Sequence, residues 1–333
     1  MNLRVIQVGV GGFGRGWLNV LKNAEGVQIA ALVDVNEEAL RKAAELLQFS
    51  PSRCFTDYGR ALREVDADAV LCVTPPAFHK EIALKAFERK LHILTEKPLA
   101  DSMASGKEMV AAAQAAGRLL LVSQNYRFRR WARTMARIVA EKQIGDMSSC
   151  AVRFAKAPAF TGSFRLQMEF PLIVDMSVHH FDLMRAVLGC DPVDIFVRSW
   201  NPAWSWFKHD ARCAAIIGMS GGVNVIYDAS WVTRGIETSW DGDWRVVGSV
   251  GTVELRGDKV ILCKDGKTEE PVELGKMPAE NQDYSIQEFK RCIETKTEPE
   301  TSGARNLPTL AMIFAALDSA TSGQPKEIAE YLA

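Results

Sequence analysis

A lysine that directly follows an apolar segment is the first candidate for chemistry in this sequence. Leu91–Thr95 has the pattern of a buried strand, and Glu96, Lys97 and Pro98 come next. An ammonium group can donate hydrogen bonds to an oxygen on which negative charge develops. Alternatively, Lys97 only marks the point where a core strand turns into solvent. The elements around it decide between the two interpretations.

An acid and a histidine form the second candidate, in the segment Pro171–Gly189, for which the pattern predicts one helix. Asp175 and His179 are four residues apart and share a helix face, whereas His180 points about 100° away. Asp182 lies on a neighbouring line of the same helix. His179 can accept a proton while Asp175 holds the imidazole. The alternative is a helix cap or a satisfied pair in the core.

A glycine-rich turn near the start of the chain has the spacing of a dinucleotide-binding motif. The apolar segment Leu3–Val8 runs into Gly9, Gly11 and Gly14, and a helical pattern follows. In such a motif the glycines allow a tight turn, close approach of the pyrophosphate, and packing of the helix on the strand. A plain Gly-rich turn with a helix N-cap is the simpler alternative. The order of strand, turn and helix favours the dinucleotide site.

The next apolar segment, VQIAALVD, ends in Asp34, 20 residues after Gly14 (34 − 14). An acid at this position accepts hydrogen bonds from the hydroxyl groups of the adenosine ribose. The residues Val35–Glu38 include two glutamates, and the first arginine nearby is Arg41. A 2′-phosphate would meet negative charge there, so the sequence predicts NAD as the cofactor, with NADP disfavoured.

Apolar strand patterns alternate with helical patterns up to residue 124, which predicts a parallel sheet with helices on both faces. Ligands of such sheets bind at the carboxyl ends of the strands. Thr74, Glu96–Lys97 and Gln124–Asn125 all follow predicted strands. Lys97 is therefore expected at the same edge as the glycine turn, which weakens the interpretation as a solvent turn.

The pattern changes after Asn125, where long strands joined by Gly-rich turns predict an open, mainly antiparallel sheet. The predicted fold is thus an α/β Rossmann domain followed by an α+β domain. We place the Rossmann domain at residues 1–124 and the substrate-binding and oligomerisation domain at 125–333. The C-terminal helix is expected to pack back on the first domain.

The composition excludes several classes of function. The net charge is −1 in 333 residues, which provides no electrostatic attraction to nucleic acid or to a membrane surface. No apolar segment approaches the roughly 20 residues that span a bilayer, and no signal peptide is recognisable. Seven cysteines lack a CxxC pair, so we expect free thiols, no metal site and a cytoplasmic protein.

With these residues identified, the whole chain resembles the Gfo/Idh/MocA oxidoreductases, the family of glucose–fructose oxidoreductase and inositol dehydrogenase. A Glu-Lys-Pro sequence combined with a downstream DxxxH is more specific than the glycine turn alone. One departure is the sequence EFPLIV before the aspartate, where relatives usually have glycines. The resemblance rests on these segments: VGVGGFG, DAVLCVTPPAFH, TEKPLA, QNYRF, VDMSVHHFDL and GSVGTVEL.

The resemblance implies an NAD(P)-dependent oxidoreductase that moves a hydride between the cofactor and a hydroxyl or keto group of a sugar, a cyclitol or a sugar derivative. It also implies a homodimer or homotetramer formed through the C-terminal sheet. The implied catalytic residues are Lys97, Asp175 and His179. The implied cofactor-binding residues are Gly9, Gly11, Gly12, Phe13, Gly14, Asp34, Thr74, Pro75, His79, Glu96, Lys97 and Asn125. The implied substrate-binding residues are Lys97, Asn125, Tyr126, Arg127, Asp175 and His179.

In this interpretation His179 is the base, Asp175 orients it, and Lys97 donates hydrogen bonds to the reacting oxygen. Pro98 would restrain the backbone, and a cis Lys97–Pro98 bond is one way to do so.

Two alternatives come from other classes of protein: a non-catalytic NAD-binding regulator, and an NAD-dependent glycosidase that oxidises the sugar ring transiently. The eight tryptophans could stack on sugar faces or pack in the core and at interfaces. The arginines of RFRRWAR could bind an anion or form a solvated or interface face.

Overall fold

The computed structural model describes residues 2–264 and 266–333, which form two compact units. Of the described residues, the first contains 2–125 and 278–307, and the second contains 126–264, 266–277 and 308–333. The sequence-based division assigned all of 125–333 to the second domain and expected the C-terminal helix to pack on the first. The segment that returns to the first unit is instead 278–307, because Ile286 and Phe289 complete that unit's core.

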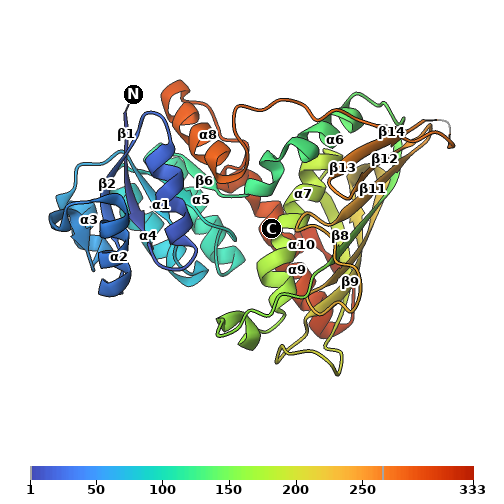
Figure 1. Ribbon diagram of the computed structural model, residues 1–333, viewed down its shortest axis with the longest axis horizontal. Coiled ribbons are helices and arrows are strands. Elements are labelled where there is room, and N and C mark those ends of the chain that lie inside the picture. Colours follow the sequence, from blue (N-terminus) through green and yellow to red (C-terminus); the bar gives the residue numbers. More distant parts are fainter. Residues whose placement is uncertain (1, 265) are drawn as a thin grey trace. The chain divides into compact units, whose positions relative to one another are not determined.

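The first unit contains a parallel six-stranded sheet with the strand order β3-β2-β1-β4-β5-β6. This is the order of a dinucleotide-binding Rossmann sheet, and it confirms the predicted fold class. In Figure 1 this unit is drawn mainly in blue and cyan. The strands are β1 (Leu3–Val8), β2 (Val27–Val33), β3 (Cys54–Phe55), β4 (Ala69–Cys72), β5 (His92–Thr95) and β6 (Leu120–Val122).

Helices cover both faces of this sheet. The helices are α1 (Gly14–Asn23), α2 (Glu37–Leu47), α3 (Tyr58–Glu64), α4 (His79–Glu88), α5 (Met103–Ala116) and α8 (Asn281–Thr295). On one face, Trp17 and Leu21 of α1 pack with Phe289 of α8 against Val5 and Leu94 of the sheet. Right-handed crossovers place α3, α4 and α5 on the other face. Because all six strands are parallel, their carboxyl ends lie at the same end of the sheet as the glycine turn.

The second unit contains a nine-stranded sheet with the order β14-β13-β12-β11-β7-β10-β9-β8-β15. Only β7 and β10 pair in parallel among these neighbours, which confirms the predicted open, mainly antiparallel sheet. The strands are β7 (Met147–Ala155), β8 (Pro192–Trp200), β9 (Arg212–Met219), β10 (Val223–Ser230), β11 (Asp243–Gly248), β12 (Thr252–Arg256), β13 (Lys259–Cys263), β14 (Glu270–Pro271) and β15 (Lys326–Glu327).

The helices of the second unit cover one face of this sheet (Figure 1). They are α6 (Arg130–Ala140), α7 (Val178–Leu188), α9 (Gly303–Ser322, which begins in the first unit) and α10 (Ile328–Leu332). The strands alternate accordingly: Val225 and Tyr227 are buried, whereas Ile226 between them is 60% exposed. The opposite face of the sheet thus presents apolar side chains to solvent.

The helix predicted over 171–189 is divided in the structure. Residues Leu172–Ser177 form a π-helix, and α7 begins only at Val178. The Ser177 hydroxyl donates to the carbonyl oxygen of Leu172 at 3.2 Å, which supports the wider turn. The stretch from Asp175 to His179 therefore crosses the junction of the π-helix with α7, and the EFPLIV sequence is where the change begins.

Candidate active site

Close backbone approaches explain why the first turn requires glycine. A Cβ atom at Gly9 would lie 2.3 Å from the carbonyl oxygen of Val73, and one at Gly14 would lie 2.2 Å from that of Gly9. Gly9 has a φ of +90°, a backbone conformation that residues other than glycine rarely adopt. The turn therefore brings β1, β4 and the start of α1 together, with Phe13 exposed at its tip.

Asp34 closes this turn from β2. Its Oδ2 accepts hydrogen bonds from the backbone N–H groups of Val10 (2.9 Å) and Gly11 (3.1 Å), and its Oδ1 accepts one from Asn36 (2.9 Å). Beside it lies a cavity of about 260 Å³. The residues that line the cavity are Val10, Gly11, Gly12, Arg15, Asn36, Glu38, Ala39, Lys42 and Ala43. A glycine turn, a helix N-terminus and a strand-end acid fit the adenosine half of NAD.

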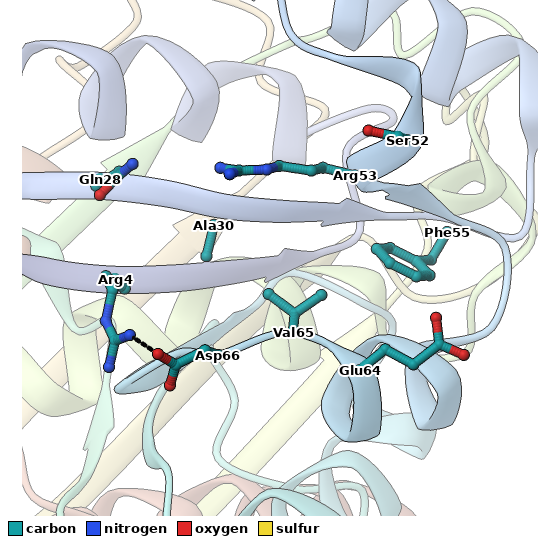
Figure 2. Close-up of a pocket in the computed structure, with 9 residues that line it drawn as sticks. All are labelled: Arg4, Gln28, Ala30, Ser52, Arg53, Phe55, Glu64, Val65 and Asp66. Carbon is teal, nitrogen blue, oxygen red and sulfur yellow. Dashed lines mark hydrogen bonds and ion pairs between the residues drawn. The ribbon is translucent and has the colours of Figure 1, made fainter.

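A second cavity, of about 450 Å³, lies elsewhere in the first unit, beside the beginnings of β1 and β2 (Figure 2). Arg4, Gln28, Arg53 and Glu64 are among its lining residues. Arg4 is paired there with Asp66. Apart from Phe55 of β3, its lining includes no residue from the carboxyl end of a strand and none from the glycine turn, where Rossmann sheets bind their ligands. We therefore expect the cofactor at the smaller cavity.

The preference for NAD over NADP remains a prediction, and the structure identifies the charged residues near the expected ribose position. Arg15 and Lys42 also line the cavity, although Lys42 is paired with Glu38 at 3.2 Å. We expect NAD to bind more tightly than NADP, because a 2′-phosphate would lie beside the Asp34 carboxylate. Quenching of tryptophan fluorescence by each cofactor measures this, and Asp34→Ser should narrow the difference. Tighter binding of NADP by the unmodified chain would contradict the prediction.

The segment after β5 is held by buried groups. Glu96 is 6% exposed, and burial raises the pKa of its carboxyl group. The Lys97–Pro98 bond is cis, as the sequence suggested. His79, predicted to contact the cofactor, is only 1% exposed, and its ring nitrogens face carbonyl oxygens of Thr74, Pro98 and Leu99. We therefore expect His79 to shape the site rather than to bind the cofactor.

In the second unit, His179 is held by an aromatic ring. Its imidazole stacks on Tyr126 with a centroid distance of 4.1 Å and an interplanar angle of 13°. The Arg129 guanidinium lies 3.7 Å from the centroid of the same tyrosine ring and pairs with Asp241. The orientation of His179 thus has a support that its sequence spacing to Asp175 did not indicate.

Asp175 has a cationic partner that the sequence analysis missed. Arg165 donates from Nε to Oδ2 at 2.5 Å and from Nη2 to Oδ1 at 3.3 Å. The same guanidinium lies over the rings of Phe160 and Phe164. Arg165 comes from a connection between β7 and the π-helix that matches no motif. Only its nearness in sequence to the DxxxH motif could have drawn attention to it.

Arginines of the RFRRWAR segment bind protein groups in the structure, while anion binding and an interface role for this segment stay predictions. Arg127, predicted to bind substrate, forms a nearly buried fork with Asp182 at 2.7 and 2.5 Å. Arg130 donates to the carbonyl oxygens of Leu274 and Gly275. An arginine in a fork with a buried carboxylate is an anchor. We therefore assign Arg127 a role in holding the 126–128 segment on α7.

His180 lies in a different environment from the adjacent His179. It is fully buried, its Nδ1 lies 2.8 Å from the Tyr227 hydroxyl, and its ring packs on Phe154 and Trp244. Burial lowers the pKa of His180 from its ordinary value of 6.5 to about 3. The folded chain therefore contains a neutral His180 throughout the physiological range.

This shift predicts a contribution of His180 to acid instability. The unfolded state takes up the proton as the pH falls through about 6.5, whereas the folded state does so only near pH 3. Between these values His180 should lower the free energy of unfolding by about 1.4 kcal/mol per pH unit. Denaturant unfolding of the wild type and of His180→Phe across this range measures the difference. If the free energy of unfolding changes with pH in the same way for both proteins, this prediction is wrong.

The described residues hold neither a metal-binding cluster nor a membrane-spanning helix. Across 2–264 and 266–333, His, Cys, Asp and Glu side chains do not gather into a group of three or more that could hold a metal ion. In the same residues, no helix combines the length and the apolar character that a membrane crossing requires. The seven cysteines are free thiols.

Two family models match the chain. Residues 3–124 match an oxidoreductase family with an NAD-binding Rossmann fold, and residues 132–254 match the Gfo/Idh/MocA C-terminal domain. The chain belongs to the Gfo/Idh/MocA oxidoreductase family. The cofactor of this family's Rossmann fold, NAD, agrees with the glycine turn and Asp34 described above.

Members of the Gfo/Idh/MocA family with known activities resemble the chain over nearly its full length. It is 26% identical to a D-apiose dehydrogenase of Paraburkholderia graminis, over 96% of this chain and 88% of that one. It is also 26% identical to a 1,5-anhydro-D-fructose reductase of Ensifer adhaerens, over 96% and 97%. A crystal structure of an Agrobacterium radiobacter oxidoreductase with NAD+, L-tartaric acid and magnesium superposes with a TM-score of 0.90. That structure is 23% identical and covers 99% of both chains, which shows the common fold.

Proposed function

We propose that the protein is an NAD-dependent dehydrogenase or reductase that acts on a secondary hydroxyl or keto group of a sugar, a cyclitol or a related derivative. The observation that carries this proposal is the location of Lys97. It follows the carboxyl end of β5, and the glycine turn follows the carboxyl end of β1 in the same parallel sheet. A group that can donate hydrogen bonds is thus next to a dinucleotide site. The similar dehydrogenase and reductase support the carbohydrate class of substrate.

The proposed chemistry divides between the two units of the chain. Bound NAD supplies the hydride acceptor, or NADH the hydride donor. His179 takes the proton of the substrate hydroxyl, and the stacking on Tyr126 keeps its ring in one orientation. Lys97 donates hydrogen bonds to the same oxygen as negative charge develops. In the reverse direction one of these two groups returns the proton.

The first crossing of the chain between the two units lies at Asn125 and Tyr126. Asn125 is the last residue of the first unit before the chain enters the second unit. The next residue, Tyr126, is the one on which His179 stacks. Asn125 is 7% exposed and follows the carboxyl end of β6 closely. One peptide bond therefore joins the edge of the Rossmann sheet to the residue that supports the proposed base.

Asp175 has a supporting role in this proposal. Its carboxylate is engaged by Arg165, so it is less suited than His179 to accept a substrate proton. We propose that Asp175 carries charge next to the substrate and helps to orient its hydroxyl groups. The exposed indoles of Trp204, Trp206 and Trp240 offer faces on which a sugar could stack, as in carbohydrate sites generally.

The activity can be tested by following NADH absorbance with a panel of sugars, cyclitols and sugar acids, in both directions. A dehydrogenase or reductase produces or consumes NADH stoichiometrically with at least one member. Turnover of a glycoside without net NADH would indicate the glycosidase instead. NAD binding with no turnover on any member would favour the non-catalytic regulator.

We further propose that a second copy of the chain covers the exposed face of the nine-stranded sheet. Ile216 and Ile226 are 56% and 60% exposed and lie opposite each other across β9 and β10. Ala151 on β7 and Phe196 on β8 extend this apolar row in register. An apolar row of this kind across adjacent strands is a typical interface surface.

This assembly makes a direct prediction. Light scattering of the purified chain should give a multiple of 36.8 kDa, and Ile216→Glu should shift the mass toward that of one chain. A charge at the centre of the apolar row would have to be buried without a partner. Lys22→Glu, on α1 of the first unit, is the matched control and should leave the mass unchanged. A wild-type mass of one chain would contradict the assembly.

A further inference from the structure

Lys97 occupies a segment that the sheet itself does not hold. The last strand-like hydrogen bond before it is from the Glu96 N–H to the Cys72 carbonyl oxygen, at 2.9 Å. Pro98, directly after it, has no N–H group to donate. If Lys97 must be held within a fraction of an ångström of a substrate oxygen, side chains of other elements have to fix its neighbours.

Trp17 holds the residue before Lys97. Its indole N–H donates to Glu96 Oε1 at 2.8 Å, and Glu96 Oε2 accepts the backbone N–H of Lys97 at 3.1 Å. The carboxylate therefore bridges α1 and the lysine backbone. Trp17 is 1% exposed, and its ring packs in the core with residues of β1, β5 and α8. The indole N–H is the only polar group of the Trp17 side chain, and this bond uses it.

His79 holds the residues after Lys97. Its Nδ1 lies 3.1 Å from the Pro98 carbonyl oxygen and 3.2 Å from that of Leu99, and its Nε2 lies 2.9 Å from that of Thr74. The ring lies between Thr74, which follows β4, and the segment that carries Lys97. A neutral imidazole donates from one nitrogen only, so the two nitrogens can be tested separately.

We propose that Trp17 and His79 are positioning residues for Lys97, fixing the backbone on its two sides. This inference rests on the proposed function, in which Lys97 donates to the reacting oxygen. Both side chains are 1% exposed, so they act through the segment and not by contact with substrate. Because Trp17 belongs to α1, which begins at the glycine turn, the same element would support the cofactor and the lysine.

The test uses three variants of the full chain and two measurements. Trp17→Phe removes the indole N–H and keeps an aromatic ring. His79→Asn places an amide near the position of Nδ1, and His79→Gln places one near Nε2. The first measurement is the rate of reductive methylation of Lys97 in the cofactor-free protein, followed by peptide mass spectrometry, with exposed Lys22 on α1 as the internal reference. The second is kcat and KM on the best substrate of the panel.

We expect Trp17→Phe and His79→Gln to lower kcat by about 10- to 100-fold, with little change in KM for NAD, because a displaced catalytic group slows the chemical step. Methylation of Lys97 relative to Lys22 should rise by about threefold as the segment opens locally. His79→Asn should stay closer to the wild type, because it can still donate to Pro98 and Leu99.

Two results would overturn the inference: normal kcat in both Trp17→Phe and His79→Gln, or a loss of kcat with unchanged methylation of Lys97. If Trp17→Phe does not fold, the comparison of His79→Asn with His79→Gln decides, and equal behaviour of these two would count against it. The methylation measurement needs no turnover. A failure of the proposed function, seen as an inactive wild type or a fully active Lys97→Ala, is therefore distinguishable from a failure of this inference.

Discussion

Replacing Lys97 with alanine should abolish turnover while leaving NAD binding nearly unchanged. Loss of the group that stabilises developing charge on the substrate oxygen typically lowers kcat by about 10²–10³ or more. Loss of a proton donor in the reverse direction adds to this effect. The cofactor contacts assigned here lie at the glycine turn and Asp34, in a cavity whose lining does not include Lys97. The expected result is thus a loss in kcat with an intact dissociation constant for NAD.

Steady-state kinetics on the best substrate, together with a fluorescence titration of NAD, make the measurement. Lys22→Ala removes an exposed lysine from α1 and serves as the matched control, with no expected effect on either quantity. Near-normal turnover in Lys97→Ala would mean that the lysine is structural and that the strand end simply turns into solvent. Loss of NAD binding along with turnover would mean that Lys97 contributes mainly to the cofactor site.

Removing His179 should lower the rate by about 10²–10⁴, as expected for a lost general base. His179 stacks on Tyr126, whose own hydroxyl pKa is raised by burial, so the phenol stays neutral beside the imidazole. For oxidation, the acidic limb of the pH–rate profile should flatten in His179→Ala, because protonation of the base no longer limits the reaction. The profile of kcat/KM for the wild type and the variant measures both effects.

The adjacent histidine provides the comparison. His180 is buried against Tyr227, and Tyr227 in turn contacts Ser177 at 2.9 Å, so this network supports the junction of the π-helix with α7. His180→Ala should destabilise the fold by about 1–3 kcal/mol through a lost buried hydrogen bond and a cavity. The folded fraction should keep most of its turnover. If His180→Ala damages catalysis more than His179→Ala, the assignment of the base is wrong.

The sequence by itself determined the two kinds of sheet and the change between them near residue 125. Strand and helix periodicity are local properties, so β1, α1 and β5 appear where the pattern predicts them. Glycine spacing likewise identified the tight turn between β1 and α1, because the close approaches at Gly9 and Gly14 exclude any side chain. The family followed from motifs that each lie within a few consecutive residues.

Only the tertiary structure decided which groups hold the candidate site residues. Trp17 meets Glu96 across 79 positions of sequence, and Asp182 meets Arg127 across 55. Local spacing suggested Asp175 as the support of His179, which stays a prediction, and the structure adds Tyr126 beside His179 and Arg165 beside Asp175. These pairings depend on how helices and loops pack and on one π-turn that shifts the helix register, none of which a local periodicity records.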